Sequence, residues 1–472
     1  MAMMMDNSTR GPDMAIRQFE ADLVTIGFGK GAKTLAAALG ARGRRVVMIE
    51  QSAQMYGGTC INIGCVPTKS LVFQAEHLQQ TGAGHPPDPG VYTHAVHTTA
   101  YLTADLRAKN FAMLDSLATV DVLTGSASFV DAHTVSVQTA DGEVIVTGEP
   151  IVIGTGSEPV VPDIPGLHGN DRVVTSTDLL VTEELPRQLV VLGGGYVGLE
   201  FAAMYARYGA EVTVLERHPA ILGQEDDDVA AAATELLAAA GVQIVTSAAV
   251  TAVDGATVHY EVDGVSASVQ GDRILVALGR RPVTAELGLD RAGVDTRADG
   301  SVVVDEHLRT NQPHIFAVGD VNGGPQFTYV SLDDYRVVLD QLDGTGRRST
   351  ADRVAVPYVL FMTPPLARVG LTERAARADG HRVKVAALPV AKMATVPRAR
   401  IVGQPEGMMK VVVDADTDQI LGAALLSHDS HEVINVVALA IRHRITASQL
   451  RDEIYTHPSM TEAFNQLLGA LT

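Results

Sequence analysis

The feature that most constrains this chain is a strand–glycine turn–helix–strand pattern in residues 21–50. An apolar segment ends in a turn with Gly27 and Gly29, a helix-favouring Ala/Leu stretch follows, and a second apolar segment ends at Glu50. Such a turn lets backbone approach a pyrophosphate, and the terminal acid can bond ribose hydroxyls. Ala32 replaces the third motif glycine, which the fingerprint tolerates. The pattern predicts a βαβ unit that binds a dinucleotide.

The same pattern returns in residues 188–216, with Gly193, Gly195 and Gly198 in the turn and Glu216 at the end of the second strand. In both units the first glycine precedes the acid by 23 residues (50 − 27 and 216 − 193). One glycine motif alone is often only a tight turn, but two complete units with terminal acids indicate two bound dinucleotides.

The acid of the second unit bears on the choice of nicotinamide. Glu216 favours the free 2′-hydroxyl of NADH, because a 2′-phosphate is usually met by arginine. Arg217 follows immediately. As a solvated surface charge it would have no role, but as a phosphate ligand it would permit NADPH, so both nucleotides stay open.

Cys60 and Cys65 are the only cysteines among 472 residues. A cysteine by itself is usually a small buried apolar residue. A bridge between these two needs an irregular turn, since residues i and i+5 point apart on a regular helix, and Gly64 and Pro67 permit one. In a reducing compartment such a pair is redox-active or binds metal, and the lack of a nearby histidine argues against zinc. Two dinucleotides beside a dithiol suggest electron flow from nicotinamide through a flavin to a disulfide.

Composition narrows the partners and the location. The formal net charge of −19 disfavours nucleic acid and anionic lipid, which attract basic surfaces. Neither a secretory signal nor an apolar run near 18 residues is apparent, so we expect a soluble, cytoplasmic protein without nucleic-acid or membrane partners. A content of 46% hydrophobic residues with 44 glycines fits an α/β protein with many tight turns.

With these motifs, the chain resembles the flavoprotein disulfide reductases, which include dihydrolipoamide dehydrogenase, glutathione reductase and mercuric reductase. The resemblance implies an α/β fold with two Rossmann-like domains and a C-terminal α+β dimerisation domain, FAD and NADH or NADPH as cofactors, and a homodimer. The implied domains are an FAD domain in two parts (20–158 and 282–350), an NAD(P) domain (159–281) and an interface domain (351–472). Beyond the motifs above, the matching segments are 153–166, 277–282, 315–320 and 457–462.

The resemblance also implies catalytic roles. Cys65 looks like the thiol beside the flavin, and Cys60 like the interchange thiol that attacks substrate. Lys69 lies four residues after Cys65, on the same helix face, where its positive charge favours a thiolate. In the family this lysine lies against the flavin and pairs with an acid that corresponds to Glu200. Tyr196 resembles the aromatic gate over the nicotinamide pocket, although it could equally be a core aromatic.

His457 and Glu462 resemble the His-Glu dyad that the partner subunit contributes in this family. An imidazole takes up a proton near neutral pH, and an attached carboxylate fixes its tautomer and raises its basicity. Asp320 looks like the family's acid to the flavin ribityl chain. The residues expected to bind the cofactors are Gly27, Gly29, Ala32, Glu50, Gly58, Thr59, Lys69, Gly156, Gly319 and Asp320 for the flavin, and Gly193, Gly195, Tyr196, Gly198, Glu216, Arg217 and Gly279 for the nicotinamide nucleotide.

The substrate needs separate evidence. The C-terminal tail carries no thiol, which disfavours mercuric reductase. A narrower resemblance, to the bacterial reactive-chlorine-resistance flavin reductases, implies reduction of hypothiocyanous acid to thiocyanate and a link to copper(II) reduction. It rests on residues 26–30, 49–52, 55–60, 326–336, 361–370, 396–400, 429–432 and 456–460.

Two alternatives stay open beside that substrate. Dihydrolipoamide dehydrogenase shares both cysteines, the lysine and the dyad, but it usually has a histidine where Thr456 stands. A flavin-bound redox sensor would use the disulfide as a switch without turnover, and the intact dyad argues against it. Dihydrolipoamide-dependent NAD⁺ reduction is a cheap test for the dehydrogenase, and steady NAD(P)H consumption with any acceptor would exclude the sensor.

Other polar groups carry weaker signals, and we expect no resident metal ion. His428 and His431 could bind copper, yet they look equally like polar residues at the start of an interface helix. His85, His94 and His97 fall in a Pro/Gly-rich stretch that predicts a solvated loop over about 81–97. The acidic run from Glu225 to Asp228 suits the start of an Ala-rich helix.

Overall fold

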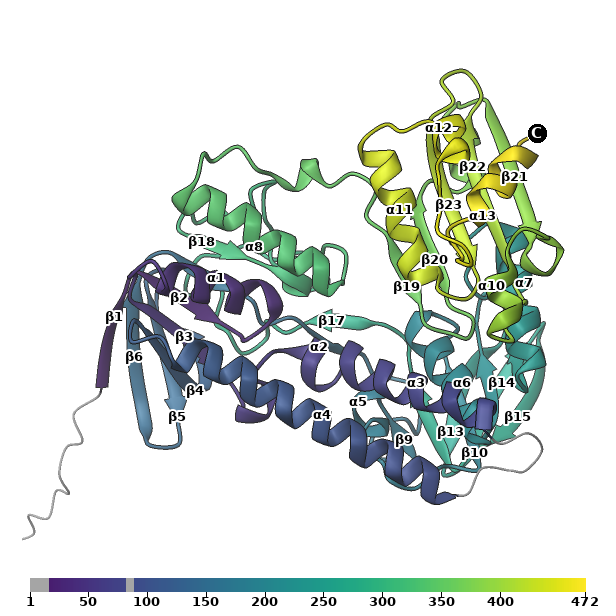
Figure 1. The fold of residues 1–472 in the computed structure, drawn as a ribbon. Helices are drawn as coiled ribbons and strands as arrows, with labels where there is room; N and C mark the ends of the chain where they lie inside the picture. Colours follow the sequence, from purple (N-terminus) through teal and green to yellow (C-terminus); the bar gives the residue numbers. More distant parts are fainter. Residues whose placement is uncertain (1–16, 82–88) are drawn as a thin grey trace, which may run out of the picture. The chain divides into compact units, whose positions relative to one another are not determined.

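The computed structural model describes residues 17–81 and 89–472 (Figure 1). These residues form two compact units, each built from three separate stretches of chain. Unit 1 holds the described residues of Met1–Asn62, Ala104–Glu158 and Arg281–Thr350. Unit 2 holds those of Ile63–Thr103, Pro159–Arg280 and Ala351–Thr472.

An eight-stranded sheet forms the centre of unit 1, in the order β1-β6-β5-β4-β3-β2-β7-β18. Strands β2, β3, β7 and β18 run parallel as neighbours, so their carboxyl ends share one edge. Strands β4, β5 and β6 form an antiparallel extension. The bounds are β1 (Arg17–Ala21), β2 (Leu23–Ile26), β3 (Val46–Glu50), β4 (Val120–Phe129), β5 (Thr134–Thr139), β6 (Gly142–Gly148), β7 (Ile151–Ile153) and β18 (Ile315–Ala317).

Helices α1 (Lys30–Gly40) and α8 (Thr328–Asp343) pack on each other and against the parallel part of this sheet. On α1 the apolar residues Ala32, Leu35, Ala36 and Leu39 are buried, with the spacing of one helix face. A short helix α2 (Thr59–Asn62) and the 3₁₀ turns Ala53–Met55 and Gly319–Asn322 complete the surroundings of the carboxyl edge. The carboxyl edge therefore carries the first glycine turn.

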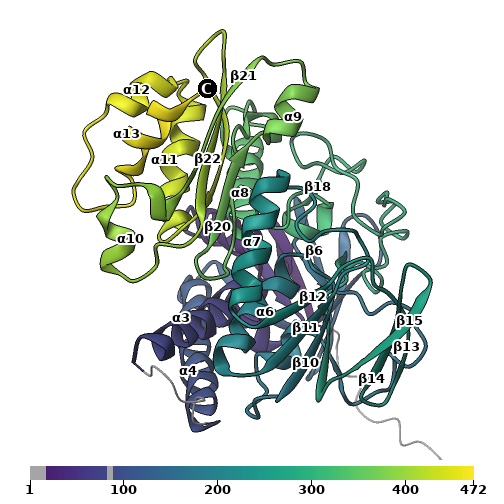
Figure 2. The ribbon, with the colours of Figure 1, turned by 90° about the vertical axis from the view of Figure 1, so that its right-hand side faces the viewer.

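Unit 2 contains a second parallel sheet, in the order β12-β11-β10-β16-β9. Helix α6 contacts three of its strands and α7 contacts β12 (Figure 2). The bounds are β9 (Val173–Val174), α5 (Ser176–Leu179), β10 (Gln188–Leu192), α6 (Tyr196–Tyr208), β11 (Glu211–Leu215), α7 (Asp227–Ala239), β12 (Val242–Val245) and β16 (Arg273–Val276). An antiparallel sheet follows from β13 (Ala249–Asp254), β14 (Thr257–Val262) and β15 (Val265–Gln270).

The C-terminal part of unit 2 is an antiparallel sheet in the order β19-β20-β23-β22-β21, with helices packed on it. Its strands are β19 (Tyr358–Leu360), β20 (Leu366–Gly370), β21 (Val383–Pro389), β22 (Met408–Asp414) and β23 (Ile420–Leu426). Its helices are α9 (Glu373–Ala378), α10 (Pro397–Ile401), α11 (Ser430–Arg442), α12 (Ala447–Asp452) and α13 (Ala463–Leu467). This mixture agrees with the α+β body expected at the C-terminus.

Two long helices follow the short helix α2 in the chain, the first in unit 2 and the second with its residues up to Thr103 in unit 2 and the rest in unit 1. Helix α3 (Cys65–Thr81) packs on α6, and the two share an apolar core. Helix α4 (Pro89–Asp115) corrects the predicted loop, because His94 and His97 lie on it. Tyr92, Ala95 and Val96 are buried at helical spacing, and this apolar face outweighs the local Pro/Gly content. His85 lies outside the described residues.

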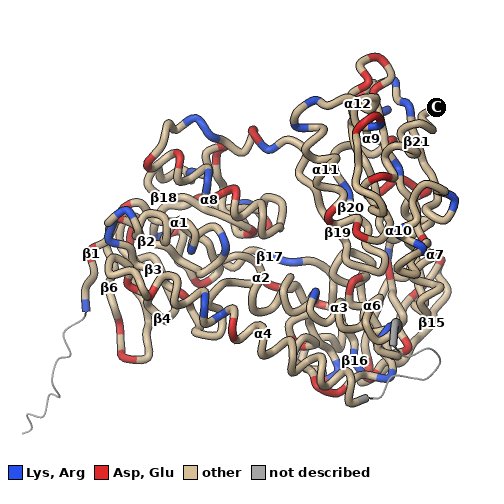
Figure 3. Tube along the Cα trace, in the orientation of Figure 1, with Lys and Arg blue, Asp and Glu red and all other residues tan. Residues whose placement is uncertain are grey.

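In the described ranges, none of the helices combines the length and apolar character that a membrane span requires. Figure 3 shows acidic and basic residues scattered along the trace in both units, in a chain of net charge −19.

Candidate active site

The first glycine turn lies at the carboxyl end of β2. Gly27 has φ +98°, and a Cβ there would lie 2.4 Å from the carbonyl oxygen of Gly154, so this position needs glycine. The N-cap of α1 is Gly29, without a side-chain cap bond. At the end of β3, Glu50 accepts a 2.8 Å hydrogen bond from the N–H of Phe28, and burial raises the pKa of Glu50. The acid therefore orients the turn from the neighbouring strand.

Ala32 occupies the place of the third glycine. Its methyl group fits because the residue that faces it is Gly154, which has no side chain. A Cβ added at Gly154 would come within 2.9 Å of the Ala32 Cβ. Gly58 approaches the same turn: its own Cβ would lie 2.7 Å from the Cα of Gly29. Backbone thus crowds the first turn on two sides.

The second glycine turn repeats this geometry in unit 2. Gly193 has φ +105°, and a Cβ there would lie 2.6 Å from the Ala277 carbonyl oxygen. A Cβ at Gly198 would lie 2.1 Å from the Gly193 oxygen, so the helix start needs a glycine here. Gly195 is the N-cap of α6, again without a side-chain cap bond.

Glu216 ends β11 and accepts a 2.7 Å hydrogen bond from the N–H of Gly194. Burial opposes its ionisation, but the donors from His218 and Gly194 outweigh burial and hold the pKa of Glu216 below its ordinary value. Arg217 is exposed beside it. Both acids are thus fixed at a strand end by a hydrogen bond from the turn, but the pKa of Glu216 is lowered whereas that of Glu50 is raised.

Cys60 and Cys65 lie on two successive helices. Cys60 is half-buried in α2 and Cys65 is exposed at the start of α3. The helix breaks between them, as their spacing requires, and Thr68 then donates a 2.7 Å hydrogen bond to the Gly64 carbonyl. The side-chain amide of Asn62 donates to the Gly58 carbonyl at 2.9 Å and holds the preceding turn. These bonds fix the backbone on both sides of the break.

In unit 1 a buried lysine approaches the cysteine turn. The Nζ of Lys33, on α1, donates to the Gly57 carbonyl at 3.2 Å and to the side chain of Asn110. Its burial lowers the pKa of Lys33 to about 8, and the nearby Cys60 opposes this shift. Lys33 belongs to none of the sequence motifs; its signal in the sequence is a charge amid the buried apolar positions of α1.

In unit 2 an acid holds the lysine of the redox helix. Lys69 Nζ lies 2.6 Å from Glu200 Oε2, and the Glu200 side chain is 9% exposed. The N–H of Phe361 donates to Glu200 Oε1 at 2.9 Å, and Lys69 Nζ lies 4.7 Å from the centre of the Phe361 ring. The structure therefore brings together Lys69 and Glu200, and it adds Phe361, which sequence reasoning did not single out.

Tyr196, the first residue of α6, has an aromatic neighbour from β19. The Tyr358 ring stands edge-on to Tyr196 at 5.6 Å, and the Tyr358 hydroxyl donates to Glu225 Oε1 at 2.8 Å. Burial raises the pKa of Tyr196, and its hydrogen bond with Tyr358 partly offsets this. Arg368 Nε lies 3.5 Å from Glu225 Oε2, with both side chains almost fully buried. Tyr358 thus connects Tyr196 to a buried ion pair.

The acidic run differs in part from the expectation. Helix α7 begins at Asp227, so only Asp227 and Asp228 occupy its first turn. Asp226 lies 3.2 Å from the buried Lys410, and Asp228 lies 3.0 Å from it. Glu225 and Asp226 are therefore buried, where they contact Arg368 and Lys410 from distant parts of the chain.

At the carboxyl end of β18, Gly319 has φ +74°, and its N–H donates to Asp334 Oδ2 at 2.6 Å. The next residue, Asp320, accepts a 2.6 Å hydrogen bond from the Ser157 hydroxyl. Two further predicted cofactor positions also have left-handed backbone: Gly156 at φ +72° and, in unit 2, Gly279 at φ +123°. Thr59, also predicted to bind cofactor, is the first residue of α2.

The His-Glu pair forms within unit 2. His457 Nδ1 lies 2.8 Å from Glu462 Oε2, and the N–H of Ser459 donates to Glu462 Oε1 at 3.0 Å. Because a carboxylate only accepts, Nδ1 carries the hydrogen and Nε2 is left to exchange a proton. The imidazole is 67% exposed and the carboxylate 12%. The acid is fixed, and the imidazole faces outward.

His428 and His431 flank the start of α11. His428 contacts Gln404 at 3.0 Å and Asp429 at 3.2 Å, and burial lowers the pKa of His428. His431 lies against Phe361, with ring centres 5.7 Å apart. Among the described residues, neither His428 nor His431 belongs to a group of three or more side chains placed to bind one metal ion.

Comparison with known proteins decides the family. The model described as pyridine nucleotide-disulphide oxidoreductase matches residues 21–334, and the dimerisation domain of the same family matches 356–468. The chain belongs to this family. Its α/β fold with two nucleotide-binding domains and a dimerisation domain is thereby confirmed.

Individual relatives are similar along nearly the whole chain. The probable pyridine nucleotide-disulfide oxidoreductase RclA of Escherichia coli K12 is 46% identical over 94% of this chain and 98% of its own length. A Staphylococcus aureus mercuric reductase is 33% identical over 97% of this chain and 83% of its own. The dihydrolipoyl dehydrogenase of Geobacillus stearothermophilus is 32% identical over 94% of both.

A solved structure described as a Cu(II) complex of HOCl-induced flavoprotein disulfide reductase RclA from E. coli superposes with a TM-score of 0.89, at 45% identity. It covers 95% of this chain and 99% of the other. The resemblance to flavoprotein disulfide reductases, with RclA as a near relative, is confirmed.

Proposed function

We propose that this protein is an FAD-dependent NAD(P)H oxidoreductase that reduces a small oxidant, hypothiocyanous acid, at the Cys60–Cys65 pair. The observation that carries the proposal is 46% identity, over nearly the full length, to RclA, whose structure is described as that of an HOCl-induced flavoprotein disulfide reductase. Induction of that relative by HOCl supports a small electrophile from reactive-chlorine chemistry as the substrate.

The residues at the two glycine turns fit the expected cofactors. Each turn offers a helix start capped by glycine, Gly29 or Gly195, whose first N–H groups suit a pyrophosphate. Each strand end offers a carboxylate, Glu50 or Glu216, in position for a ribose. We propose FAD at the first turn and NADH or NADPH at the second. Bound FAD, with NAD(P)H, supplies the electrons that return the disulfide to a dithiol.

The chain's own residues then act on the oxidant. The Cys60 thiolate attacks the sulfur of hypothiocyanous acid; a sulfur–sulfur bond forms, the sulfur–oxygen bond breaks, and the oxygen leaves as water with a proton from His457. Cys65 then attacks Cys60 Sγ and thiocyanate leaves. The proton of the Cys65 thiol passes to His457. In sum, two thiols and hypothiocyanous acid give a disulfide, thiocyanate, water and one proton. Lys69, four residues after Cys65 on α3, is proposed to supply positive charge that favours a thiolate at Cys65.

The proposed homodimer brings His457 to the thiols of the other subunit. The dimerisation-domain match supports this arrangement, as does the dyad, whose imidazole is 67% exposed and so able to meet another chain. Glu462 holds Nδ1 and leaves Nε2 for the proton that the departing oxygen needs. His457 and Glu462 are thus proposed as the general acid and its positioning residue.

The deciding experiment is NAD(P)H oxidation by the purified flavoprotein with hypothiocyanous acid, corrected for the reaction without enzyme. We expect rapid turnover that collapses in Cys60→Ser and in Cys65→Ser, with flavin content unchanged. His457→Gln should lower kcat by about 100-fold, as for loss of a general acid. The exposed His443→Gln on the same domain is the matched control. Undiminished activity in Cys60→Ser would refute the proposal, and preferred oxidation of dihydrolipoamide would favour the dehydrogenase.

Copper(II) is a second acceptor to test, because the similar RclA structures are described as Cu(II) complexes. Its reduction is read as copper(I) captured by a chelator during NAD(P)H consumption. We expect this activity to depend on Cys60 and Cys65 as well. Copper(I) formation that persists in the double serine variant would place copper reduction outside the dithiol.

A further inference from the structure

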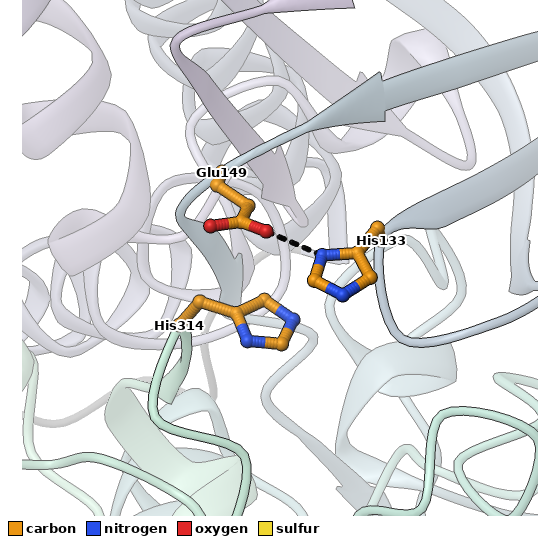
Figure 4. A group of neighbouring side chains, drawn as sticks. All are labelled: His133, Glu149 and His314. Carbon is orange, nitrogen blue, oxygen red and sulfur yellow. Dashed lines mark ion pairs between the residues drawn. The ribbon is translucent and has the colours of Figure 1, made fainter.

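Three side chains far apart in the sequence meet at one edge of the unit 1 sheet (Figure 4). His133 lies in the turn between β4 and β5, Glu149 lies between β6 and β7, and His314 directly precedes β18. One potential ligand atom from each lies within 4.8 Å of the others. In the part of the chain that the structure describes, this is the one such group of three. It is not part of the proposed redox machinery.

Backbone hydrogen bonds hold the chain at His133 and His314 and on both sides of Glu149. The Gly148 N–H donates to the His133 carbonyl at 3.2 Å, and the Ile151 N–H donates to the His314 carbonyl at 2.9 Å. Asp131 accepts from the His133 N–H at 2.8 Å and shapes the turn. The ligand-bearing Cα atoms are therefore held in place, so little backbone entropy remains to be lost on binding an ion.

The side-chain contacts leave one unprotonated nitrogen on each neutral imidazole. His133 Nδ1 lies 2.5 Å from Glu149 Oε1, and His314 Nε2 lies 2.7 Å from the Ala132 carbonyl oxygen. Because these oxygens only accept, both nitrogens carry hydrogens in this arrangement. An ion shared with Glu149 would replace the hydrogen on His133 Nδ1, and His314 would bind through Nδ1, which keeps its lone pair. A ring nitrogen that donates to a carbonyl while the other binds metal is the usual support for a histidine ligand.

A modest rotation would let these groups converge. The two rings now stack with centres 4.3 Å apart and planes 9° from parallel, so their lone pairs do not share a focus. Donor atoms about 2.0–2.2 Å from one ion lie roughly 3.3 Å apart, whereas the candidate ligand atoms lie within 4.8 Å of one another, so small side-chain rotations must adjust their separations. His133 and Glu149 are 52% and 55% exposed and can turn without repacking a core.

We propose that His133, Glu149 and His314 form a binding site for a divalent first-row transition ion, Zn²⁺ or Cu²⁺. Two imidazoles and one carboxylate prefer these ions to Ca²⁺ or Mg²⁺, which favour all-oxygen sites. Three protein ligands leave a position for water. The ion would join the β4–β5 turn, the β6–β7 connection and the start of β18.

The test uses the full-length, untagged, flavin-loaded protein carrying Cys60→Ser and Cys65→Ser, so that the redox thiols cannot bind the ion. Zn²⁺ titrated calorimetrically should bind with one equivalent at this site, and Cu²⁺ more tightly. His133→Ala and His314→Ala should each weaken that binding at least about tenfold. The exposed His259→Ala, on β14, is the matched control and should bind as the parent does.

Thermal unfolding gives a second measurement, because an ion that binds only the folded state raises the melting temperature. Zn²⁺ should stabilise the parent and His259→Ala, and the His133→Ala/His314→Ala double variant should gain nothing. Glu149→Gln, which keeps the shape of the side chain, also weakens binding if the carboxylate is a ligand, and it serves if the double variant does not fold. Unchanged one-equivalent binding in these variants would overturn the site. Because the redox thiols are absent throughout, this result is independent of the proposed oxidant.

Discussion

The two glycine turns solve the same steric problem with glycine at different places. Gly27 in unit 1 and Gly193 in unit 2 both have left-handed backbone and both face a strand carbonyl that excludes a Cβ. At the second turn the helix itself supplies further room through Gly198. At the first turn the helix carries Ala32, and the facing strand supplies the room through Gly154. The third glycine of the fingerprint therefore serves to let the helix pack closely on the strand, and a glycine on either element can do this.

The helices that follow the turns also differ in the sign of one buried charge. Helix α1 carries Lys33, whose ammonium reaches the Gly57 carbonyl within unit 1. Helix α6 carries Glu200, whose carboxylate reaches Lys69 within unit 2. Each helix that follows a glycine turn thus places a charged side chain against the segment that carries the cysteines: α1 near Gly57 in unit 1, and α6 at Lys69 in unit 2.

The largest expected effect comes from filling the shared glycine position. Gly27→Ala should abolish flavin retention, and Gly193→Ala should keep the flavin but weaken NAD(P)H binding about 100-fold or more, because both force strained backbone and a carbonyl contact. Flavin absorbance and nucleotide titration measure these losses. Gly43→Ala and Gly241→Ala, which have φ +88° and +89° but open space around them, separate backbone strain from crowding. Equal losses in these controls would make strain alone responsible.

A double-mutant cycle tests where the first turn finds its room. Gly154→Ala should destabilise the protein by about 1–3 kcal/mol, because its Cβ would crowd Ala32. Adding Ala32→Gly should recover most of that loss, although the single Ala32→Gly change is itself destabilising. Urea unfolding and flavin retention measure both. Additive effects would show that the two positions do not share the space.

The charge on α1 predicts a pH dependence. Burial holds the pKa of Lys33 to about 8, below its ordinary 10.5, so between these values the unfolded chain binds more protons than the folded one. This group should therefore make the free energy of unfolding larger as pH rises from 8 toward 10.5, by at most about 3 kcal/mol. Lys33→Met should lack this increment in urea unfolding at pH 8 and pH 10. The exposed Lys109→Met should retain it.

The smallest expected effect concerns Tyr196, the aromatic residue that begins α6; the corresponding helix of the first turn, α1, begins with Lys30 instead. Tyr358→Phe keeps the ring beside Tyr196 but removes the hydroxyl that bonds Glu225. If Tyr196 gates the nicotinamide, a looser gate should lower the Kd for NAD(P)H by about two- to tenfold, with thiol oxidation unchanged. Stopped-flow measurements of the two half-reactions separate these steps. The exposed Tyr101→Phe is the control, and identical Kd values would remove Tyr358 from the gate.

Local patterns predicted both βαβ units, because turn sterics and strand-end acids act within about 30 residues of chain. The break between the cysteines followed in the same way from their spacing. The pattern failed in residues 89–97, where the apolar face of a long helix decides, and at Glu225, where Tyr358 and Arg368 come from far along the chain. Lys33, Phe361 and the His133 group escaped notice for the same reason: tertiary contacts alone bring their partners near.

One consequence follows from the glycine caps of α1 and α6. A helix start without a side-chain cap presents backbone amides that an anion can bond. On α1 the Gly31 amide already donates to Ser331 Oγ at 3.0 Å, and under the proposed function a pyrophosphate would accept from the remaining amides. The dinucleotide is then a structural component of the turn as well as a reagent. Under riboflavin shortage the newly made chain would keep an open turn in unit 1, and proteases would reach it sooner.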